Sequence, residues 1–258
     1  MRILMIGDVI GHPGRNAIAS LVPGLRSELQ LDMVIANGEN TAGGFGITPD
    51  TARELMDSDV DVITSGNHIW KQKEIIPFIN EEWPLLRPAN YPSGVPGRGY
   101  IRLGEAVVIS LMGRVFMAPI DCPFKTADAL LEEARQSTMP KVIIVDFHAE
   151  ATSEKQGLGW YLDGRVSLVA GTHTHVATAD ARILPNGTAF VSDLGMVGPV
   201  NSVIGAEPQD ALDRFLTQTP KRLTVATAGP TQFNSVLVEV DETTGAATGI
   251  ERLDRELN

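Results

Sequence analysis

The sequence predicts an α/β fold in which helices cover mixed β-sheets, with two sheets packed against each other. Short apolar runs alternate with amphipathic helical stretches in both halves of the chain, as in strands joined by helices. Hairpin patterns around turn sequences such as Asn186-Gly187 add antiparallel strands. The chain has 258 residues, and we expect a single domain over residues 1–258, because α/β folds of this size are often single domains.

In the first half, the expected strands cover residues 2–7, 33–36 and 60–63, and the expected helices cover 15–29, a segment from 49 onward, and 70–79. Pro23 and Gly24 should kink the first helix or shift its start. Thr48 is a suitable N-cap for the second helix, and Pro49 is a suitable first residue. The stretch 86–99 holds three prolines and three glycines, so we expect an ordered surface loop there.

In the second half, alternation predicts a hairpin of strands 106–111 and 114–118, followed by a helix that Thr126 caps and that runs to about 136. A buried strand over 142–145, a helix from Ser153 and a strand over 167–170 should follow. A second hairpin is expected from strands 182–184 and 188–191. The chain should end in strands 222–226, 235–240 and 250–253.

Composition and charge exclude several classes of protein. A net charge of -11 repels long polyanions, so we expect no long nucleic acid as a partner. A small phosphate ester stays open as a substrate if metal cations supply positive charge locally. No apolar stretch approaches the ~20 residues of a membrane span, so we expect no membrane partner. Cys122 is the only cysteine, which rules out an internal disulfide and predicts a reducing, cytoplasmic location.

Residues that commonly bind metals follow the predicted strands. They are Asp8, Glu39 with Asn40, Asn67 with His68, His148, and His173 with His175. Strands that share a direction deliver such ends to one edge of a sheet, where ligand sites form. Four of the five histidines lie at these strand ends. Imidazole and carboxylate groups suit zinc, iron, manganese and nickel, and the set is larger than one tetrahedral zinc ion requires.

The last two of these histidines are close together in the sequence. His173 and His175 are two residues apart, so their side chains would point the same way in an extended segment. A turn is needed if they are to bind two adjacent ions rather than chelate one. Two metal ions about 3.5 to 4 Å apart are the usual device for hydrolysing phosphate esters. The pattern therefore favours dinuclear chemistry on a phosphate ester.

Five motifs in chain order carry a family resemblance. They are Ile-Gly-Asp8, Asn-Gly-Glu39-Asn40, Thr-Ser-Gly-Asn67-His68, Asp-Phe-His148-Ala-Glu-Ala-Thr-Ser-Glu and Gly-Thr-His173-Thr-His175. The chain resembles the calcineurin-like metallophosphoesterases over nearly its whole length, and within them the bacterial YmdB-like phosphodiesterases. It departs from many superfamily members at Asp8-Val-Ile10, where they have Asp-x-His, and at Glu39, where they have a bridging aspartate. The YmdB-like branch shares both departures.

The resemblance implies a four-layer α-β-β-α sandwich and a centre of two metal ions, iron in the first place with manganese as the alternative. One ion would be held by Asp8, Glu39, Asn40 and His175, and the other by Glu39, Asn67, His148 and His173. Glu39 would bridge them, and His68 would be the proton donor. The implied substrates are 2′,3′- and 3′,5′-cyclic nucleotides, opened by in-line attack of a hydroxide that the metals hold.

Each residue taken alone also has a structural explanation. Asp8 could be a turn or capping residue and His148 a core histidine, so the functional interpretation rests on the combination. His12 is expected to be a loop residue. Arg87 could contact a substrate or form a structural salt bridge. Asp193 is a candidate acceptor that would orient the His173 loop.

Other functions stay open at this stage. The same site could serve a phosphomonoesterase or a small-oligonucleotide nuclease. The protein could instead be a regulatory module that binds metals and nucleotide without turnover. A mononuclear amidohydrolase also uses His-x-His, but on an early strand rather than after Ala170. The oligomeric state is open as well, a homo-oligomer included.

Overall fold

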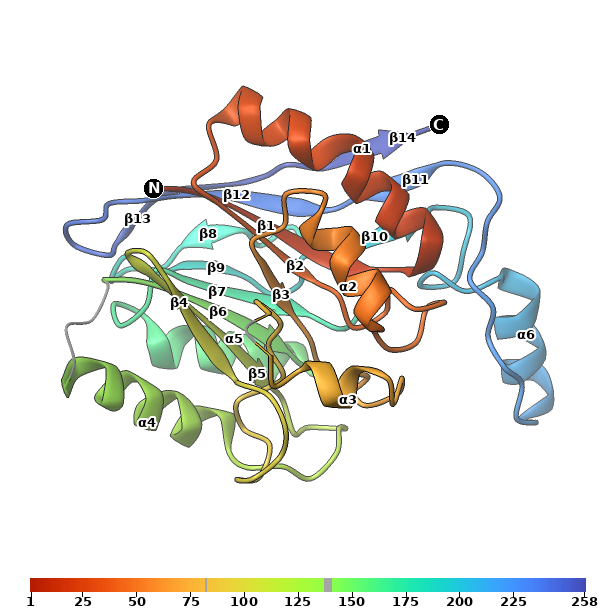
Figure 1. Ribbon diagram of the computed structural model, residues 1–258, viewed down its shortest axis with the longest axis horizontal. Helices are drawn as coiled ribbons and strands as arrows, with labels where there is room; N and C mark the ends of the chain where they lie inside the picture. The colour runs from red at the N-terminus through yellow and green to blue at the C-terminus, as the bar shows by residue number, and fades with distance from the viewer. Residues whose placement is uncertain (82, 137–140) are drawn as a thin grey trace.

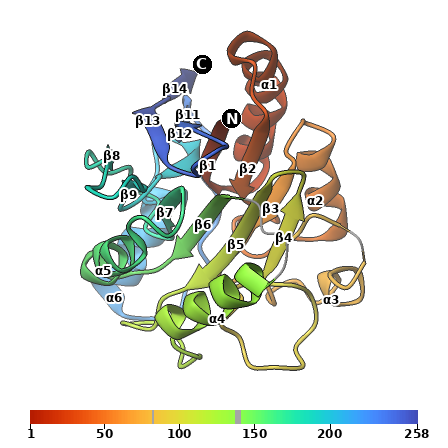
Figure 2. The ribbon, with the colours of Figure 1, turned by 90° about the vertical axis from the view of Figure 1, so that its left-hand side faces the viewer.

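The computed structural model describes residues 1–81, 83–136 and 141–258. Its layers run helix, sheet, sheet, helix (Figure 1). Two helices, α1 (Gly11–Leu29) and α2 (Pro49–Met56), cover the outer face of one sheet. Two others, α4 (Pro123–Gln136) and α5 (Thr152–Leu162), cover the outer face of the other (Figure 2). The expected α-β-β-α sandwich is confirmed.

The first sheet is built around β1 (Arg2–Val9), which pairs in parallel with β2 and β10 and antiparallel with β12. Among the described residues this sheet has eight strands. The others are β2 (Met33–Asn37), β3 (Val62–Thr64), β10 (Met196–Pro199), β11 (Thr231–Phe233), β12 (Ser235–Val240), β13 (Ala247–Arg252) and β14 (Arg255–Leu257). Because β1, β2 and β3 are parallel, their carboxyl ends lie at one edge.

The second sheet has the strand order β4-β5-β6-β7-β9-β8 in the part of the chain that the structure describes. Its strands are β4 (Tyr100–Leu103), β5 (Ala106–Met112), β6 (Val142–His148), β7 (Leu168–Thr172), β8 (Arg182–Ile183) and β9 (Ala189–Val191). The four inner strands are parallel, and the two edge strands are antiparallel to their neighbours. Both sheets are therefore mixed, as expected.

Side chains alternate between the two faces of each sheet. On β1, Met5 packs between the sheets, whereas Leu4 and Ile6 pack under the helices. On β6, Ile144 points between the sheets and Val145 points toward the helices α4 and α5. Both faces of these strands are covered, which explains why their sequences are continuous apolar runs. Polar residues on the inner face therefore stand out.

The first helix begins earlier than predicted. α1 starts at Gly11 rather than Arg15, so His12 lies in its first turn and not in a loop. Pro13 is tolerated there because the first helical N–H groups have no partner inside the helix. The helix also continues through Pro23 to its end at Leu29. By contrast, the predicted start of α2 is confirmed, with the Thr48 hydroxyl accepting from the backbone N–H of Thr51.

The predicted helix over 70–79 is wrong. Only α3 (Ile75–Phe78) is helical, and the preceding residues form turns. The backbone N–H of Ile69 donates to the carbonyl of Gly66 at 3.3 Å, and that of Lys71 donates to His68 at 2.9 Å. These turns hold Asn67 and His68 against other parts of the chain, which a continuing helix would not do.

Three boundaries in the second half also differ from prediction. β5 pairs with β4 and β6, and 114–118 forms no strand because the N–H groups of Arg114 and Val115 donate to the Glu154 carboxylate on α5. α4 begins at Pro123, before Thr126. The segment 222–226 makes one isolated bridge, from Val225 to the segment before α6 (Pro208–Thr217).

Other sequence predictions in this half are confirmed. Strands β8 and β9 form the expected hairpin, and Gly187 adopts a φ of 99° in its turn. The loop over 86–99 is ordered by a bridge between Leu86 and Arg98. Within the described ranges, no helix combines the length and the apolar character needed to cross a membrane.

Candidate metal centre

The predicted ligand residues meet at the carboxyl ends of the parallel strands, between the two sheets. Asp8 is the second-last residue of β1, His148 ends β6, and His173 directly follows β7. Glu39 and Asn67 follow β2 and β3 by a few residues. The first sheet thus supplies the acidic and amide groups, while the second supplies imidazoles.

A β-bulge turns Asp8 toward the second sheet. The register of β1 against β2 shifts between Ile6 and Asp8. Consequently Ile6 and Val9 both pack under the helices although they are three residues apart. Asp8 faces inward instead, where its Oδ2 accepts from the backbone N–H of His173 at 3.0 Å. Without this extra residue, Asp8 would point into the apolar layer under α1.

Glu39 lies at the middle of the cluster and is fully buried. Its Oε1 is 3.2 Å from His148 Nε2 and 3.2 Å from His68 Nδ1. Its Oε2 accepts from the backbone N–H of His68 at 3.0 Å. Burial by itself would raise the pKa of Glu39, but the two histidines outweigh burial and hold the pKa well below its usual value. Glu39 is therefore a carboxylate at neutral pH.

His148 Nε2 has three neighbours that compete for it. Asn67 Oδ1 is 3.0 Å away, His173 Nδ1 is 2.9 Å away, and Glu39 Oε1 is 3.2 Å away. A single N–H cannot satisfy three such partners. Gly66 permits this crowding, because a Cβ at that position would lie 2.0 Å from the His148 ring. The arrangement suits a cation between these groups better than a proton.

Asn40 and His175 form a second pair of neighbours beside Asp8. The Asn40 side-chain nitrogen is 3.2 Å from His175 Nε2, and its Oδ1 is 2.7 Å from His68 Nδ1. His175 Nε2 is 3.8 Å from Asp8 Oδ1, while its Nδ1 donates to the carbonyl of Ile204 at 2.8 Å. That last bond leaves the lone pair of the neutral ring on Nε2, the nitrogen that would bind a metal ion.

A turn separates the two loop histidines, as binding two ions requires. His173 has a φ of 101° and His175 a φ of 64°, both in the left-handed region that non-glycine residues rarely adopt. Thr174 between them donates from its N–H at 3.1 Å and from its hydroxyl at 2.7 Å to Asp193 Oδ2. The expected acceptor role of Asp193 is thus observed. Lys155 on α5, which is fully buried, completes the support with its Nζ 2.6 Å from the same oxygen.

Loss of this buried ion pair should unfold the protein more easily. Lys155→Met is expected to lower the free energy of unfolding by ~3 kcal/mol, because Asp193 would keep a buried charge without its partner. Urea denaturation measures the loss. Lys125→Met is the control, since Lys125 is 79% exposed and its pair with Asp128 spans 3.7 Å, so its loss should stay below ~1 kcal/mol. Equal losses in the two variants would contradict the supporting role.

Two independent observations indicate that these residues fit a metal centre. Glu39, His148 and His173 offer ligand atoms that all lie within 4.8 Å of one another. Asp8 Oδ1 is buried and has no hydrogen-bond partner, which is costly for a carboxylate oxygen unless a cation completes it. Asp8 Oδ1 lies 3.8 Å from His175 Nε2 and 3.9 Å from His148 Nδ1, between His175 and the Glu39-His148-His173 group. The donor set therefore fits a metal centre.

A polar network behind His148 was missed by sequence reasoning. Asp146 is fully buried and accepts from the Thr172 hydroxyl at 2.7 Å, from the Asn37 side-chain amide at 3.2 Å, and from the Thr64 hydroxyl. Thr172 Oγ1 also lies 3.0 Å from His148 Nδ1. Asp146 was detectable, because it precedes His148 by two residues in one strand and so shares its inner face.

Burial and neighbouring charges set the protonation of this cluster. Burial lowers the pKa of His148, but Glu39 and Asp8 outweigh it and raise the pKa to about 9. Burial together with His148 lowers the pKa of His173 to about 3, so that ring is neutral. Burial raises the pKa of Asp146 to about 6, against the hydrogen bond from Thr64. In the metal-free protein one imidazolium therefore sits among the carboxylates.

This raised pKa predicts how pH acts on the metal-free protein. The stability from the His148 proton is fully present below the ordinary pKa of 6.5 and is lost as pH rises through about 9. The melting temperature measured in chelator should therefore fall between about pH 7 and 9. Metal affinity should rise over the same window, because a ligating imidazole must first lose its proton. A pH-independent affinity in this window would contradict the assignment.

Two other sequence candidates have structural roles. Arg87 donates to the carbonyls of Pro96 and Pro88, at 3.1 and 2.8 Å, and forms no salt bridge with the residues that the structure describes. His12 is exposed and lies 3.2 Å from the Asn16 side chain on α1. The glycine-rich segment near Glu39 instead brings Phe45 against His68, with ring centroids 4.4 Å apart.

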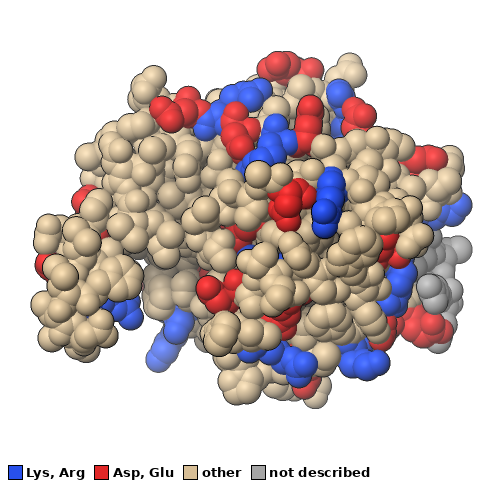
Figure 3. All heavy atoms as spheres, turned by 180° about the vertical axis from the view of Figure 1, so that it is seen from behind, with Lys and Arg blue, Asp and Glu red and all other residues tan. Residues whose placement is uncertain are grey.

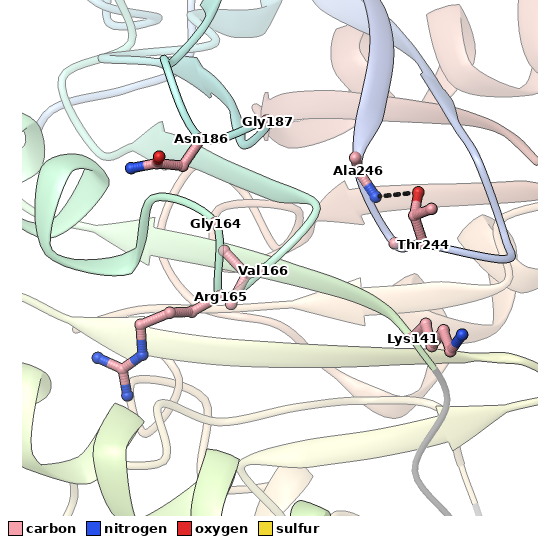
Figure 4. A pocket seen from close by; sticks show the side chains of 9 residues that line it. Lys141, Gly164, Arg165, Val166, Asn186, Gly187, Thr244 and Ala246 are labelled. Carbon is pink, nitrogen blue, oxygen red and sulfur yellow. Dashed lines mark hydrogen bonds between the residues drawn. The ribbon is translucent and has the colours of Figure 1, made fainter.

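A cavity of about 650 Å³ opens directly from the cluster. Asn40, His68 and His175 form its inner end, and Phe45 forms part of its wall. Its size is that of pockets which hold small organic ligands. Another cavity, of about 70 Å³, lies beside Lys141 and Val166 (Figure 4). These residues precede β6 and β7, so the small cavity is at the opposite edge of the sheet and takes no part in the centre.

Comparisons with known proteins agree with this geometry. The sequence model of the YmdB-like protein family matches residues 4–253. A Bacillus subtilis (strain 168) protein named 2′,3′-cyclic-nucleotide 2′-phosphodiesterase is 49% identical over 257 residues, covering 98% of this chain and 96% of that protein. A solved hypothetical protein from Thermus thermophilus has a TM-score of 0.93 at 42% identity and covers 99% of both chains. A solved novel phosphatase from Mycoplasma pneumoniae has a TM-score of 0.92 at 35% identity and covers 99% of this chain and 93% of that chain. The chain therefore belongs to the YmdB-like protein family.

Proposed function

We propose that this protein is a metal-dependent phosphodiesterase. It hydrolyses nucleoside 2′,3′-cyclic phosphates at the bond to the 2′-oxygen, and the product is the nucleoside 3′-phosphate. The observation that carries the proposal is the convergence of Glu39, His148, His173 and the unpartnered Asp8 Oδ1 next to Asn40, His68 and His175, which line the 650 Å³ cavity. The name and the 49% identity of the Bacillus subtilis relative support this choice of bond. We propose 3′,5′-cyclic nucleotides as further substrates of the same centre.

The proposed ligand sets follow two groups of neighbouring side chains, His148 with Asn67 and His173, and His175 with Asn40. Asp8, Glu39, Asn40 and His175 would hold one metal ion, and Glu39, Asn67, His148 and His173 would hold the other. Glu39 is shared between them. Iron is the proposed metal, with manganese as the alternative. Such a pair supplies positive charge to the phosphoryl oxygens and makes water acidic enough to be a nucleophile at neutral pH.

His68 is the proposed proton donor to the leaving 2′-oxygen. Its Nδ1 is held 2.7 Å from Asn40 Oδ1 and 3.2 Å from Glu39 Oε1, so this nitrogen carries a hydrogen. Its Nε2 has no hydrogen bond within the described part of the chain, and the side chain lines the cavity. Phe45 packs on the ring and restricts its rotation. As an imidazolium, His68 can thus donate the Nε2 proton to the leaving 2′-oxygen and keep its Nδ1–H bonded to Asn40 and Glu39.

Turnover of 2′,3′-cyclic AMP by protein purified without chelator tests the proposal. The expected product is 3′-AMP, separated from 2′-AMP by chromatography, together with about two metal equivalents per chain by elemental analysis. Release of 2′-AMP would place the cleavage at the other bond. Retention of unchanged cyclic nucleotide on metal-loaded protein would make it a binding module, and conversion of 3′-AMP to adenosine would make it a phosphomonoesterase.

Two broader expectations stay proposals. We propose that the reaction uses one catalytic domain over residues 1–258, because both sheets contribute residues to the centre. We also propose a cytoplasmic location, since Cys122 is the only cysteine and is free.

A further inference from the structure

The far wall of the 650 Å³ cavity differs in charge from the rest of the protein. Arg214 on α6 and Arg222 in the segment after it line that wall, together with Lys221. The whole chain carries a net charge of -11, so basic residues gathered on one wall of one cavity are unusual for its surface. The inner end of the same cavity is formed by Asn40, His68 and His175. One continuous space therefore joins the metal centre to a basic wall.

The two arginines have no partner for their guanidinium groups within the described part of the chain. Lys221 lies 3.0 Å from Asp210 and 2.6 Å from Asp213, so its charge is already balanced. Arg214 and Arg222 are exposed, and their guanidinium groups form no ion pair or hydrogen bond with the residues that the structure describes. An arginine presents a planar set of donors that matches a phosphate group. The positive charge left for a ligand at this wall is therefore that of Arg214 and Arg222.

Helix α6 and the residues after it, which carry Arg214 and Arg222, extend away from the body of the protein. α6 projects from the sandwich in Figure 1. In Figure 3, which views the molecule from behind, a hollow separates this projection at the left from the body, and Lys or Arg side chains stand beside the hollow. Apolar atoms of Ile204, Leu223 and Val225 also line the cavity. The space thus offers an apolar middle between the metal residues and the arginines.

We propose that Arg214 and Arg222 form a subsite for a second phosphate, carried on the 5′-oxygen of the nucleoside 2′,3′-cyclic phosphate. This inference rests on the proposed function, which places the cyclic phosphate at the metal centre. The nucleoside then spans the apolar middle of the cavity, and the 5′-phosphate meets the basic wall. The preferred substrates are 5′-phosphorylated nucleoside 2′,3′-cyclic phosphates and the 3′ ends of short RNA fragments that carry the same group.

The charge of the remaining surface limits the length of such a fragment. Phosphates beyond the first would leave the cavity and meet an acidic protein, whose net charge repels polyanions. A dinucleotide should therefore be bound well, and a longer strand should gain nothing more. This distinguishes a subsite for one phosphate from a general nucleic-acid groove, whose affinity grows with each contacted phosphate.

The test compares KM for three adenosine substrates: 2′,3′-cyclic AMP, its 5′-phosphorylated form, and the dinucleotide ApA ending in a 2′,3′-cyclic phosphate. The wild type should show a KM about 10- to 100-fold lower for both extended substrates, from charge-assisted hydrogen bonds to the added phosphate. Arg214→Gln with Arg222→Gln should bring this ratio to about one. Arg182→Gln is the matched control, because Arg182 is an exposed arginine on edge strand β8 and should keep the wild-type ratio.

Three results would overturn the subsite. They are a wild-type ratio near one, a ratio unchanged in the double variant, and a ratio that keeps rising for a decamer ending in the cyclic phosphate. Binding gives a readout independent of turnover: the metal-loaded protein should bind adenosine 3′,5′-bisphosphate about 10- to 100-fold more tightly than 3′-AMP, and the double variant should bind both alike. If no cyclic nucleotide is hydrolysed but this binding difference holds, the proposed function fails and the subsite stands.

Discussion

Glu39→Gln is expected to give a folded protein that binds both metals at least about 100-fold more weakly and is nearly inactive. Glu39 is the shared carboxylate of the two proposed ligand sets, and its Oε1 lies 3.2 Å from His148 Nε2 and 3.4 Å from the Asn40 side-chain nitrogen. The glutamine keeps the size of the side chain and can still accept the His68 backbone N–H through its carbonyl oxygen. The charge is lost, and with it the main attraction for two cations. Elemental analysis after gel filtration, with turnover on the same sample, measures both effects.

Glu54→Gln provides the matched control. Glu54 is 53% exposed and pairs with Arg15 on the surface, so its replacement should leave metal content and turnover unchanged. Circular dichroism and urea denaturation of both variants establish that each is folded. A Glu39→Gln protein that keeps close to two metal equivalents and near-normal activity would refute the shared-ligand assignment.

His68→Ala should separate proton transfer from metal binding. Asn67, the neighbouring residue, contacts His148 Nε2 at 3.0 Å, whereas His68 faces the cavity and lies outside the Glu39-His148-His173 group. We therefore expect the variant to keep its metals and its melting temperature. A general acid typically contributes ~10² to 10⁴ in rate, so kcat for 2′,3′-cyclic AMP should fall by about that factor. The loss on bis(p-nitrophenyl) phosphate should be much smaller, because that leaving group departs without a proton.

His12→Ala is the control for this experiment, since His12 is exposed on α1 and should affect neither substrate. Equal slowing of both substrates by His68→Ala would point to an electrostatic role instead. Loss of a metal equivalent would make His68 a ligand, and the proton-donor role would be wrong.

The sequence alone predicted the placement of the site, for a simple physical reason. Asp8 and His148 end continuous apolar runs, and parallel strands buried on both faces must deliver their carboxyl ends to one edge. Glu39 and Asn67 follow such runs in glycine-containing turns. The structure brings all of these side chains together between the sheets.

Predictions from the local sequence pattern were wrong where contacts with distant residues determine the backbone conformation. The stretch 70–79 has a helical pattern, yet contacts of Asn67 with His148 and of His68 with Glu39 hold the chain before it in turns. The segment 114–118 alternates like a strand, but Glu154 on α5 takes its first N–H groups. In both cases the deciding contact spans more than 25 residues, which no local periodicity records.

The positions of the buried strands and the set of ligand-type residues that follow them were thus determined by the sequence itself, because burial on two faces leaves a direct apolar signature. Only the tertiary structure decided which atoms face one another. The bulge that turns Asp8 inward, the buried carboxylate of Asp146 behind His148, and the approach of Arg222 to the cavity each depend on packing between distant segments. Side-chain direction at such points is set by the register of neighbouring strands and by loop closure, both of which are properties of the assembled fold.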